Sequence, residues 1–262
     1  MFQNISIQLN VFYRLLQRDL KVFAQNAVDN YFNALCWVLL CLIVYQFIMP
    51  ELGWIHKGEF LLVNCVVSKS FFGIMDNVTS AVADLDGNKT ISYDMTLPIS
   101  HTMLFIKIAI SNTIYAFLLA LMIIPVGKLL LWNYLPFPYF CFPKFILIIT
   151  LSSLLAGFFS LFIIAITKTV VQIEDVWGGI IFPMFCLGGF EFTWKTMHSI
   201  SPTLAYLDLC NPLVFMFEGM RAATLDPALS LPFWHCAGAL ILFMIPMGYV
   251  GIYLLKKRLD AI

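Results

Sequence analysis

The chain contains several apolar runs long enough to cross a membrane, and these runs limit its fold more than any other feature. Residues 30–50, for example, include no Asp, Glu, Lys or Arg. A helix needs about 20 apolar residues to cross a hydrocarbon core of about 30 Å. The whole chain is 61% hydrophobic and only 11% charged, whereas about a quarter of the residues in a soluble domain are charged. We therefore predict an all-α integral membrane protein with little mass outside the bilayer.

Six membrane spans account for the apolar runs. They are predicted at residues 31–49, 60–82, 104–127, 145–167, 176–190 and 233–255. The second span is interrupted by Lys69 and Asp76. The fifth span is short, because an isolated helix of that length covers only about 22 Å. It either stops short of the far side of the membrane or continues into a polar re-entrant segment.

Residues 1–28 precede the first span and form a separate amphipathic segment. Apolar side chains recur at helical spacing at Ile5, Leu9, Phe12, Leu16, Leu20 and Phe23. Arg14, Arg18 and Lys21 lie mainly off this stripe. The pattern favours a helix in the inner-leaflet interface with its basic face toward lipid headgroups; a helix packed on another protein is the alternative. Residues 29–262 then form a single transmembrane domain.

The distribution of basic residues predicts the orientation of the chain. Lysine and arginine cluster at both ends, as Arg14, Arg18 and Lys21 before the first span and Lys256, Lys257 and Arg258 after the last. Six spans place both termini on one side, and the positive-inside rule makes that side cytoplasmic. The loop between the second and third spans then faces the cytoplasm. The formal net charge is zero, which gives no indication of a nucleic-acid partner.

That loop, ADLDGNKTISYDMTLPIS at residues 83–100, is the longest polar run in the chain. It does not fit a calcium site. An EF-hand loop with Gly87 as its glycine requires oxygen ligands at its first and twelfth positions, where Val82 and Tyr93 stand. Nor does it fit lipid phosphotransfer, since the Ala-Arg and further aspartates that follow Asp-Gly in such enzymes are missing after Asp86-Gly87.

The rest of the chain gives no further indication of catalysis. The P-loop, H-E-x-x-H and G-x-S-x-G motifs do not occur, and the four histidines are far apart. We expect no catalytic, cofactor or metal site in this chain. The loop is better explained as a short helix lying across the membrane plane, ended by Leu97-Pro98, that fits a groove on a soluble partner.

The loop resembles the corresponding loop of ABC type-2 exporter permeases. Those permeases carry there an acidic residue, a glycine and a threonine, a short apolar helix, Pro-x-Ser, and a lysine that opens the third span. This chain has Asp84 or Asp86, Gly87, Thr90, Met95, Leu97, Pro98-Ile99-Ser100 and Lys107 in the same order. It departs from the pattern by a weaker acidic-basic start and by the pair Asn88-Lys89 inserted between the glycine and the threonine.

A second stretch, CNPLVFMFEGMRAATL at residues 210–225, resembles the signature of that family before the last span. The matching residues are Asn211, Pro212, Leu213, Phe215, Glu218 and Arg221. In the family this signature lies in short re-entrant helices on the outer side. Glu218 and Arg221 are three residues apart and can pair on one helix face. The pair either orients the re-entrant helices or acts as a gate or substrate contact.

The resemblance covers nearly the whole chain, and the nearest subgroup is that of nodulation-factor, polysaccharide and drug efflux permeases. It implies the permease subunit of an ATP-driven exporter in the bacterial inner membrane, with two copies forming the pathway. ATP and Mg²⁺ would be held by a separate ATP-binding cassette subunit, and membrane lipids surround the permease. The residues implied in ATPase coupling are Asp84, Asp86, Gly87, Thr90, Leu97 and Pro98.

Two charged residues in the second span leave another function open. Lys69 and Asp76 lie two helical turns apart, and intramembrane charges usually face a bundle interior or an aqueous cavity. They are candidate pathway residues, although Lys69 could equally snorkel or pair with a neighbour. The alternative function is an ion- or proton-coupled secondary transporter or channel that uses these two residues and Glu218. The sequence does not indicate the substrate.

Overall fold

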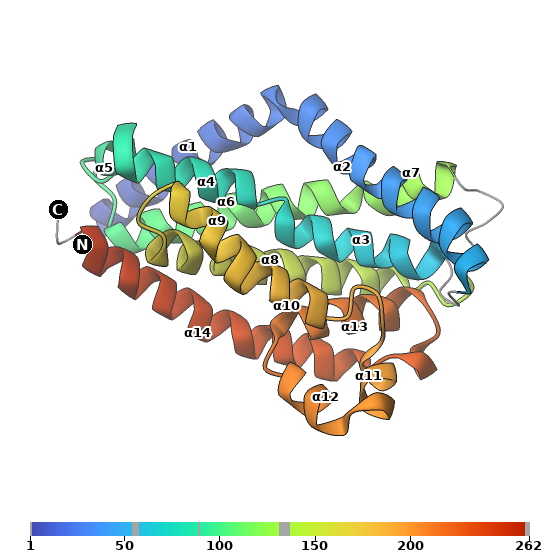
Figure 1. The fold of residues 1–262 in the computed structure, drawn as a ribbon. Helices are drawn as coiled ribbons and strands as arrows, with labels where there is room; N and C mark the ends of the chain where they lie inside the picture. Colours follow the sequence, from blue (N-terminus) through green and yellow to red (C-terminus); the bar gives the residue numbers. More distant parts are fainter. Residues whose placement is uncertain (1, 54–57, 89, 131–136, 260–262) are drawn as a thin grey trace.

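The computed structural model describes residues 2–53, 58–88, 90–130 and 137–259, and within these ranges the regular secondary structure is entirely helical. Figure 1 shows long helices lying side by side in an elongated bundle. The start of α1 (Phe2–Gln25), the short α5 (Thr90–Asp94) and the end of α14 (Phe233–Leu259) lie at the same end of the bundle. The prediction of an all-α fold is confirmed.

Five helical segments are long and apolar enough to cross a membrane. They are Ala27–Ile48, Gly58–Ala83, His101–Leu129, Phe142–Ile166 and Phe233–Leu259. These segments match five of the six predicted spans. The predicted fifth span falls in α9 (Val171–Val176), a π-helical turn (Trp177–Ile181) and α10 (Phe182–Leu187). This stretch is roughly 25 Å long, shorter than a hydrocarbon core, so a sixth full crossing stays a prediction.

Three of the five segments are interrupted. The first consists of α2 (Ala27–Ile43) and a π-helical turn (Val44–Ile48), the second of α3 (Gly58–Phe72) and α4 (Met75–Ala83), and the third of α6 (His101–Leu121) and α7 (Ile123–Leu130). The break in the second segment lies at Gly73, whose N–H still reaches the Lys69 carbonyl at 3.0 Å. It separates Lys69 from Asp76, which the sequence predicted on one continuous helix.

The N-terminal helix α1 packs against α6 and meets α2 at an angle at Asn26 (Figure 1). Within this helix, the side chain of Leu15 is buried, whereas those of Ile5, Ile7 and Leu9 are exposed. The helix therefore presents an apolar surface outward while it covers part of the bundle. Its location in the membrane interface, and the division of the chain at residue 28, stay predictions.

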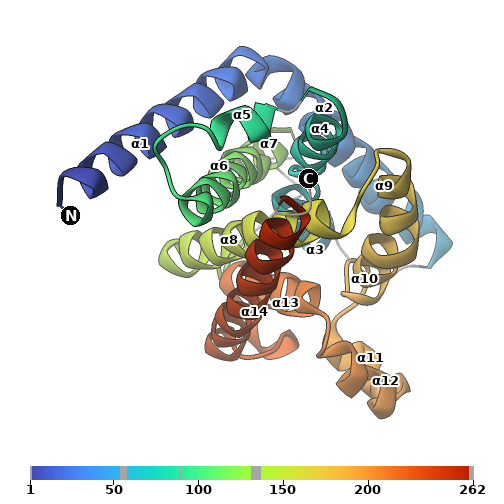
Figure 2. The same cartoon turned by 90° about the vertical axis from the view of Figure 1, so that its left-hand side faces the viewer.

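Helix α8 (Phe142–Ile166) lies at the centre of the bundle and packs against α3, α4, α6, α13 (Pro212–Thr224) and α14 (Figure 2). Hydroxyl and amide groups pair between these helices. The Ser70 and Ser153 hydroxyls lie 2.8 Å apart, and the Asn112 amide donates to the Ser160 hydroxyl at 2.8 Å. Because a bilayer offers no water, polar side chains in such a bundle find partners on neighbouring helices.

Short helices fill the segment between α10 and α14, where the sequence predicted short re-entrant helices. α11 (Trp194–Ile200) and α12 (Pro202–Asp208) project from the bundle near the end opposite α5 (Figures 1 and 2). Helix α13 is buried along nearly its whole length. That these helices re-enter a membrane stays a prediction.

A glycine at the contact between α6 and α8 provides a test of this packing. A Cβ added at Gly157 would collide with the Thr113 hydroxyl and the Ala109 carbonyl oxygen. We expect Gly157→Ala to destabilise the protein by about 1–3 kcal/mol through overpacking, measured by thermal unfolding in detergent. Gly238→Ala is the matched control, because a Cβ at Gly238 in α14 meets no atom within 4 Å. Equal melting temperatures of the two variants would contradict this packing.

Candidate functional site

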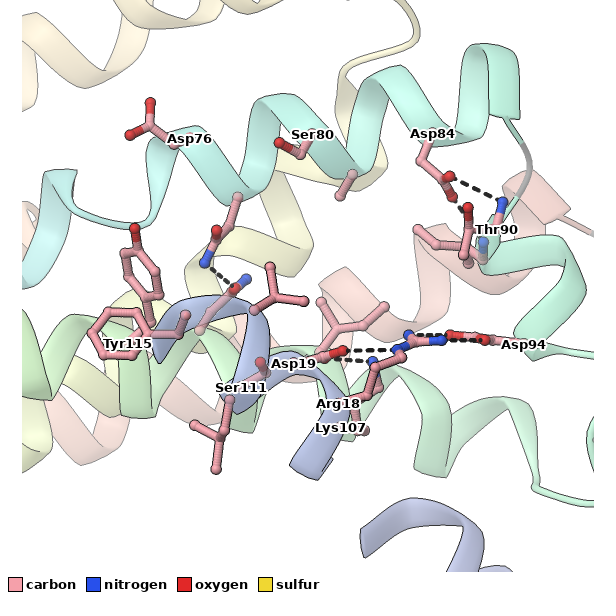
Figure 3. Close-up of a pocket in the computed structure, with 18 of the residues that line it drawn as sticks. Arg18, Asp19, Asp76, Ser80, Asp84, Thr90, Asp94, Lys107, Ser111 and Tyr115 are labelled. Carbon is pink, nitrogen blue, oxygen red and sulfur yellow. Dashed lines mark hydrogen bonds and ion pairs between the residues drawn. The ribbon is translucent and has the colours of Figure 1, made fainter. Parts of the chain in front are cut away.

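The loop between α4 and α6 is folded by the side chain of Asp84. After a π-helical turn (Asp84–Asn88) the chain enters α5, and the Asp84 carboxylate accepts the N–H of Thr90 at 2.9 Å and of Ile91 at 2.7 Å (Figure 3). The first N–H groups of a helix have no partner within it, so Asp84 caps α5. Partial burial by itself would raise the pKa of Asp84. The hydrogen bonds from Thr90 and Ile91 together have a larger, opposite effect, so the pKa of Asp84 lies below its ordinary value.

The other end of α5 is held by an ion pair with α1. Asp94 is only 3% exposed. Its two carboxylate oxygens accept hydrogen bonds from the Arg18 guanidinium at 3.0 and 2.8 Å. The hydrogen bond to Asp94 raises the pKa of Arg18 although partial burial lowers it. Two parallel bonds between a guanidinium and a carboxylate fix orientation as well as distance, so α5 is held in a defined position on α1.

The same arginine belongs to a longer chain of charges. Arg18 Nε contacts the carboxylate of Asp19 at 3.3 Å, and Asp19 also accepts from Lys107 Nζ at 2.7 Å. Lys107 lies in α6 and is only 3% exposed. We call Asp94, Arg18, Asp19 and Lys107 the loop clamp. It joins α5, α1 and α6 in one line of charges, as Figure 3 shows.

A cavity of about 640 Å³ lies beside the loop clamp. It is bordered by α1, α4, α5 and α6, and it extends from Asp84 and Asp94 at the loop end to Asp76 and Tyr115 (Figure 3). Among the described residues, no group of three His, Cys, Asp or Glu side chains is placed to hold a metal ion.

A second polar cluster lies in the part of the bundle near α11. Arg221 Nη1 donates to Glu218 at 2.8 Å, and both side chains are almost fully buried. Arg221 also donates to the Asn64 side chain at 3.1 Å and to the carbonyl of Gly189. Its guanidinium carbon lies 4.3 Å from the centre of the Phe60 ring, within range of a cation–π interaction. The arginine therefore joins α13 to α3 and to the end of α10.

Glu218 and Asn211 extend this cluster to the surrounding backbone. Glu218 accepts the N–H of Trp194 and of Leu231, each at 2.8 Å. These are the first residue of α11 and a residue just before α14. Asn211 caps α13 by accepting the Leu213 N–H at 3.1 Å, and it donates to the Met184 carbonyl at 2.7 Å. The cluster therefore fixes the start of α11, the end of α10 and the approach to α14.

The comparison with known families agrees with this architecture. The family model described as ABC-2 type transporter matches residues 10–225. The match includes most of α1, the loop clamp, the residues Asn211, Glu218 and Arg221, and four of the five segments long enough to cross a membrane. This chain belongs to the ABC-2 type transporter family. It is a multi-pass membrane permease of an ABC transporter. A search of curated proteins found no match to the chain.

The structure places most of the predicted coupling residues of the permease around α5. Asp84 and Thr90 contact each other, and Gly87 is exposed in the turn between them. Leu97 and Pro98 lie beyond the helix, which ends at Asp94, so the predicted helix reaching Leu97 is too long. The side chain of Asp86 lies outside the described residues.

The Pro-x-Ser motif has a local structural role. Ser100 is the N-cap of α6, and its hydroxyl accepts the N–H of Met103 at 3.3 Å. Pro98 cannot continue a helix from α5 because it lacks an N–H. The motif therefore separates α5 from the third span and starts that span.

Sequence reasoning missed the loop clamp of the permease. Arg18 and Asp94 are 76 residues apart, and Asp19 and Lys107 are 88 apart. The available signal was charge complementarity. The N-terminal segment carries Arg18 and Asp19 close to the expected membrane surface, and the loop and the third span bring Asp94 and Lys107 to the same surface. Opposite charges at one interface could have been paired.

The two charged residues of the second span are not paired in the permease. Lys69 is partly buried, and Asp76 is exposed and borders the cavity. Within the part of the chain that the structure describes, neither side chain forms an ion pair. A turn at Gly73 lies between the two residues, and their charges still interact electrostatically.

The buried pair near α11 gives a quantitative test. We expect Glu218→Ala and Arg221→Ala each to destabilise the permease by about 3–5 kcal/mol, because each leaves a buried charge without its partner. The double variant should lose much less than the sum of the two. A double-mutant cycle by thermal unfolding in detergent measures this coupling. Strictly additive losses would show that the pair does not act as a unit.

Proposed function

We propose that this permease is the transmembrane subunit of an ATP-driven exporter. In this proposal a separate ATP-binding subunit docks against α5, and the loop clamp carries its motion into α1 and α6. The observation that supports this is the bidentate pair between Asp94 and Arg18, with Lys107 held by Asp19. A short helix that only turned the chain would not need charged links to two other helices.

The surface around α5 is open to a partner. Tyr93 is 66% exposed, and Thr90, Thr96 and Pro98 are exposed as well. A Cβ added at Gly87 would meet no atom within 4 Å. The two ends of α5 are thus bonded to Asp84 and Arg18, while the side that carries Tyr93 is available for docking.

The proposed cycle uses two copies of the permease with the pathway between them, in a bacterial inner membrane with both termini cytoplasmic. ATP and Mg²⁺ belong to the partner subunit. Closure of the ATPase dimer would push α5, and a rigid connection would turn that push into movement of whole helices. The ion pairs supply this connection because their geometry fixes both the distance and the orientation of α5 relative to α1.

The test of the proposal begins with purification from the native membrane under mild extraction. We expect a stoichiometric ATP-binding subunit and ATPase activity in the purified complex. If the permease purifies alone and without activity, the proposal fails. Ion-coupled transport through Lys69 and Asp76 would then be the account to test.

A charge exchange tests the connection between α5 and α1. Arg18→Asp or Asp94→Arg places like charges at the contact, and we expect at least a tenfold loss of ATP-dependent transport with normal expression. The double variant restores opposite charges and should recover a substantial part of transport. Lys21→Asp is the control, because Lys21 is exposed on the same helix and is not part of the loop clamp. Absence of recovery, with all variants well folded, would argue against the connection.

A substitution in the open turn tests docking separately. Gly87→Trp adds a large side chain where the permease itself has space. We expect the melting temperature of the isolated permease to stay within about 2 °C of wild type, since surface changes are usually small, while the amount of co-purified ATPase subunit falls at least fivefold. Undiminished co-purification would place the docking surface elsewhere.

A further inference from the structure

The residues that border the cavity beside the loop clamp carry an excess of negative charge. Four aspartates border it, Asp19, Asp76, Asp84 and Asp94, together with only two basic residues, Arg18 and Lys107. Each basic residue is already neutralised by a carboxylate, Arg18 by Asp94 and Lys107 by Asp19. The border therefore keeps two negative charges, on Asp84 and Asp76.

These two carboxylates differ in what surrounds them. Asp84 is engaged by the backbone N–H groups of α5. Asp76 is exposed at the far end of the cavity, and among the described residues it forms no ion pair. Asp76 borders the cavity near Tyr115, and in Figure 3 its carboxylate points away from the other labelled side chains and has no dashed contact. Lys69 interacts electrostatically with Asp76 but forms no ion pair with it, so Asp76 is the carboxylate available to a ligand.

Apart from its charged residues, the cavity is lined by two aromatic rings, by apolar side chains and by neutral polar side chains such as Asn77, Ser80 and Ser111. The rings of Phe23 and Tyr115 meet edge to face, with centres 4.6 Å apart, and Leu104 and Ile108 line the same space. The Asn112 amide at this wall is satisfied by Asn77 and Ser160, so it adds no charge. Aromatic ring faces attract cations, and the apolar side chains can cover a hydrocarbon group.

We propose that this cavity binds an amphiphilic organic cation, such as a protonated or quaternary amine joined to an apolar group. Asp76 supplies the counter-charge, and Phe23 and Tyr115 contact the apolar and cationic parts. This deepens the proposed function by assigning a substrate class, and it rests on that function only for the step of transport. The ligand enters either as a soluble amine or as the amine headgroup of a membrane lipid.

The probe for this site is radiolabelled tetraphenylphosphonium, and tetraphenylborate is an anion of nearly the same shape. The full-length permease with its co-purified ATPase is placed in phosphatidylglycerol nanodiscs, which contain no amine lipid, and binding is measured without nucleotide. We expect saturable binding of the phosphonium and none of the borate. We expect Asp76→Asn to weaken phosphonium binding at least tenfold and Tyr115→Leu to weaken it severalfold.

Asp175→Asn is the matched control, since Asp175 is an exposed aspartate in α9 away from the cavity, and its binding should equal that of wild type. Equal binding to Asp76→Asn and wild type, equal binding of the two probes, or no phosphonium binding overturns the proposal. In nanodiscs containing phosphatidylethanolamine, loss of phosphonium binding assigns the site to a lipid headgroup, and unchanged binding assigns it to a soluble amine.

The same samples test the cation site and the exporter proposal independently. Loss of the co-purified ATPase would contradict the exporter proposal without affecting phosphonium binding to the permease alone. Failure of the phosphonium to bind, with the ATPase present and active, would contradict only the cation site.

Discussion

The position of α5 depends on one ion pair, between Asp94 and Arg18. Asp94 is buried at the end of α5, whose start is capped by Asp84 and whose Ile91 packs against the core. A buried carboxylate without a partner is costly, so the loop folds where the guanidinium of α1 can reach it. Because the side chain of Arg18 is 45% exposed, solvent screens the pair, and we assign it about 1–3 kcal/mol rather than the full value of a buried pair. The interaction is therefore strong enough to position a helix of five residues.

At both ends of the bundle, buried charged side chains are paired with opposite charges. Near the loop, Lys107 is buried because Asp19 accompanies it. Near α11, Arg221 is buried because Glu218, Asn64 and the Gly189 carbonyl surround its guanidinium. In both places a charged side chain joins elements that are distant in sequence. Between them the bundle is held by apolar packing and by neutral pairs such as Ser70 and Ser153. Charges thus define the ends of the bundle, and the middle is free of ion pairs among the described residues.

Much of this architecture could be predicted from the sequence, because hydropathy alone marks where a helix can cross a membrane. The apolar runs predicted five spans that match helices long and apolar enough to cross a membrane, and the short fifth block was expected to be unusual. Hydropathy does not report local helix geometry, so the break at Gly73 between Lys69 and Asp76 was missed. The predicted helix to Leu97 was too long because Asp94, its actual end, turns inward to Arg18.

The candidate site was predicted only in part. The motif around Gly87 and Thr90 identified the loop, and the spacing of Glu218 and Arg221 predicted their pairing, which the structure shows. The partners of Asp94 and Lys107 were not found, because they lie in the N-terminal helix and no local spacing connects them. Such contacts depend on how α1 folds back over α6, which is a property of the tertiary structure.

Amide hydrogen exchange in the assembled transporter tests the central claim most directly. The exchange of α1 and α5 would be compared in the permease bound to its ATPase, with and without ATP. If the loop clamp carries motion from α5 into the bundle, ATP changes exchange in both helices together, and Asp94→Asn confines the change to α5. A change in wild type that is limited to α5, with α1 unaffected, would contradict the account.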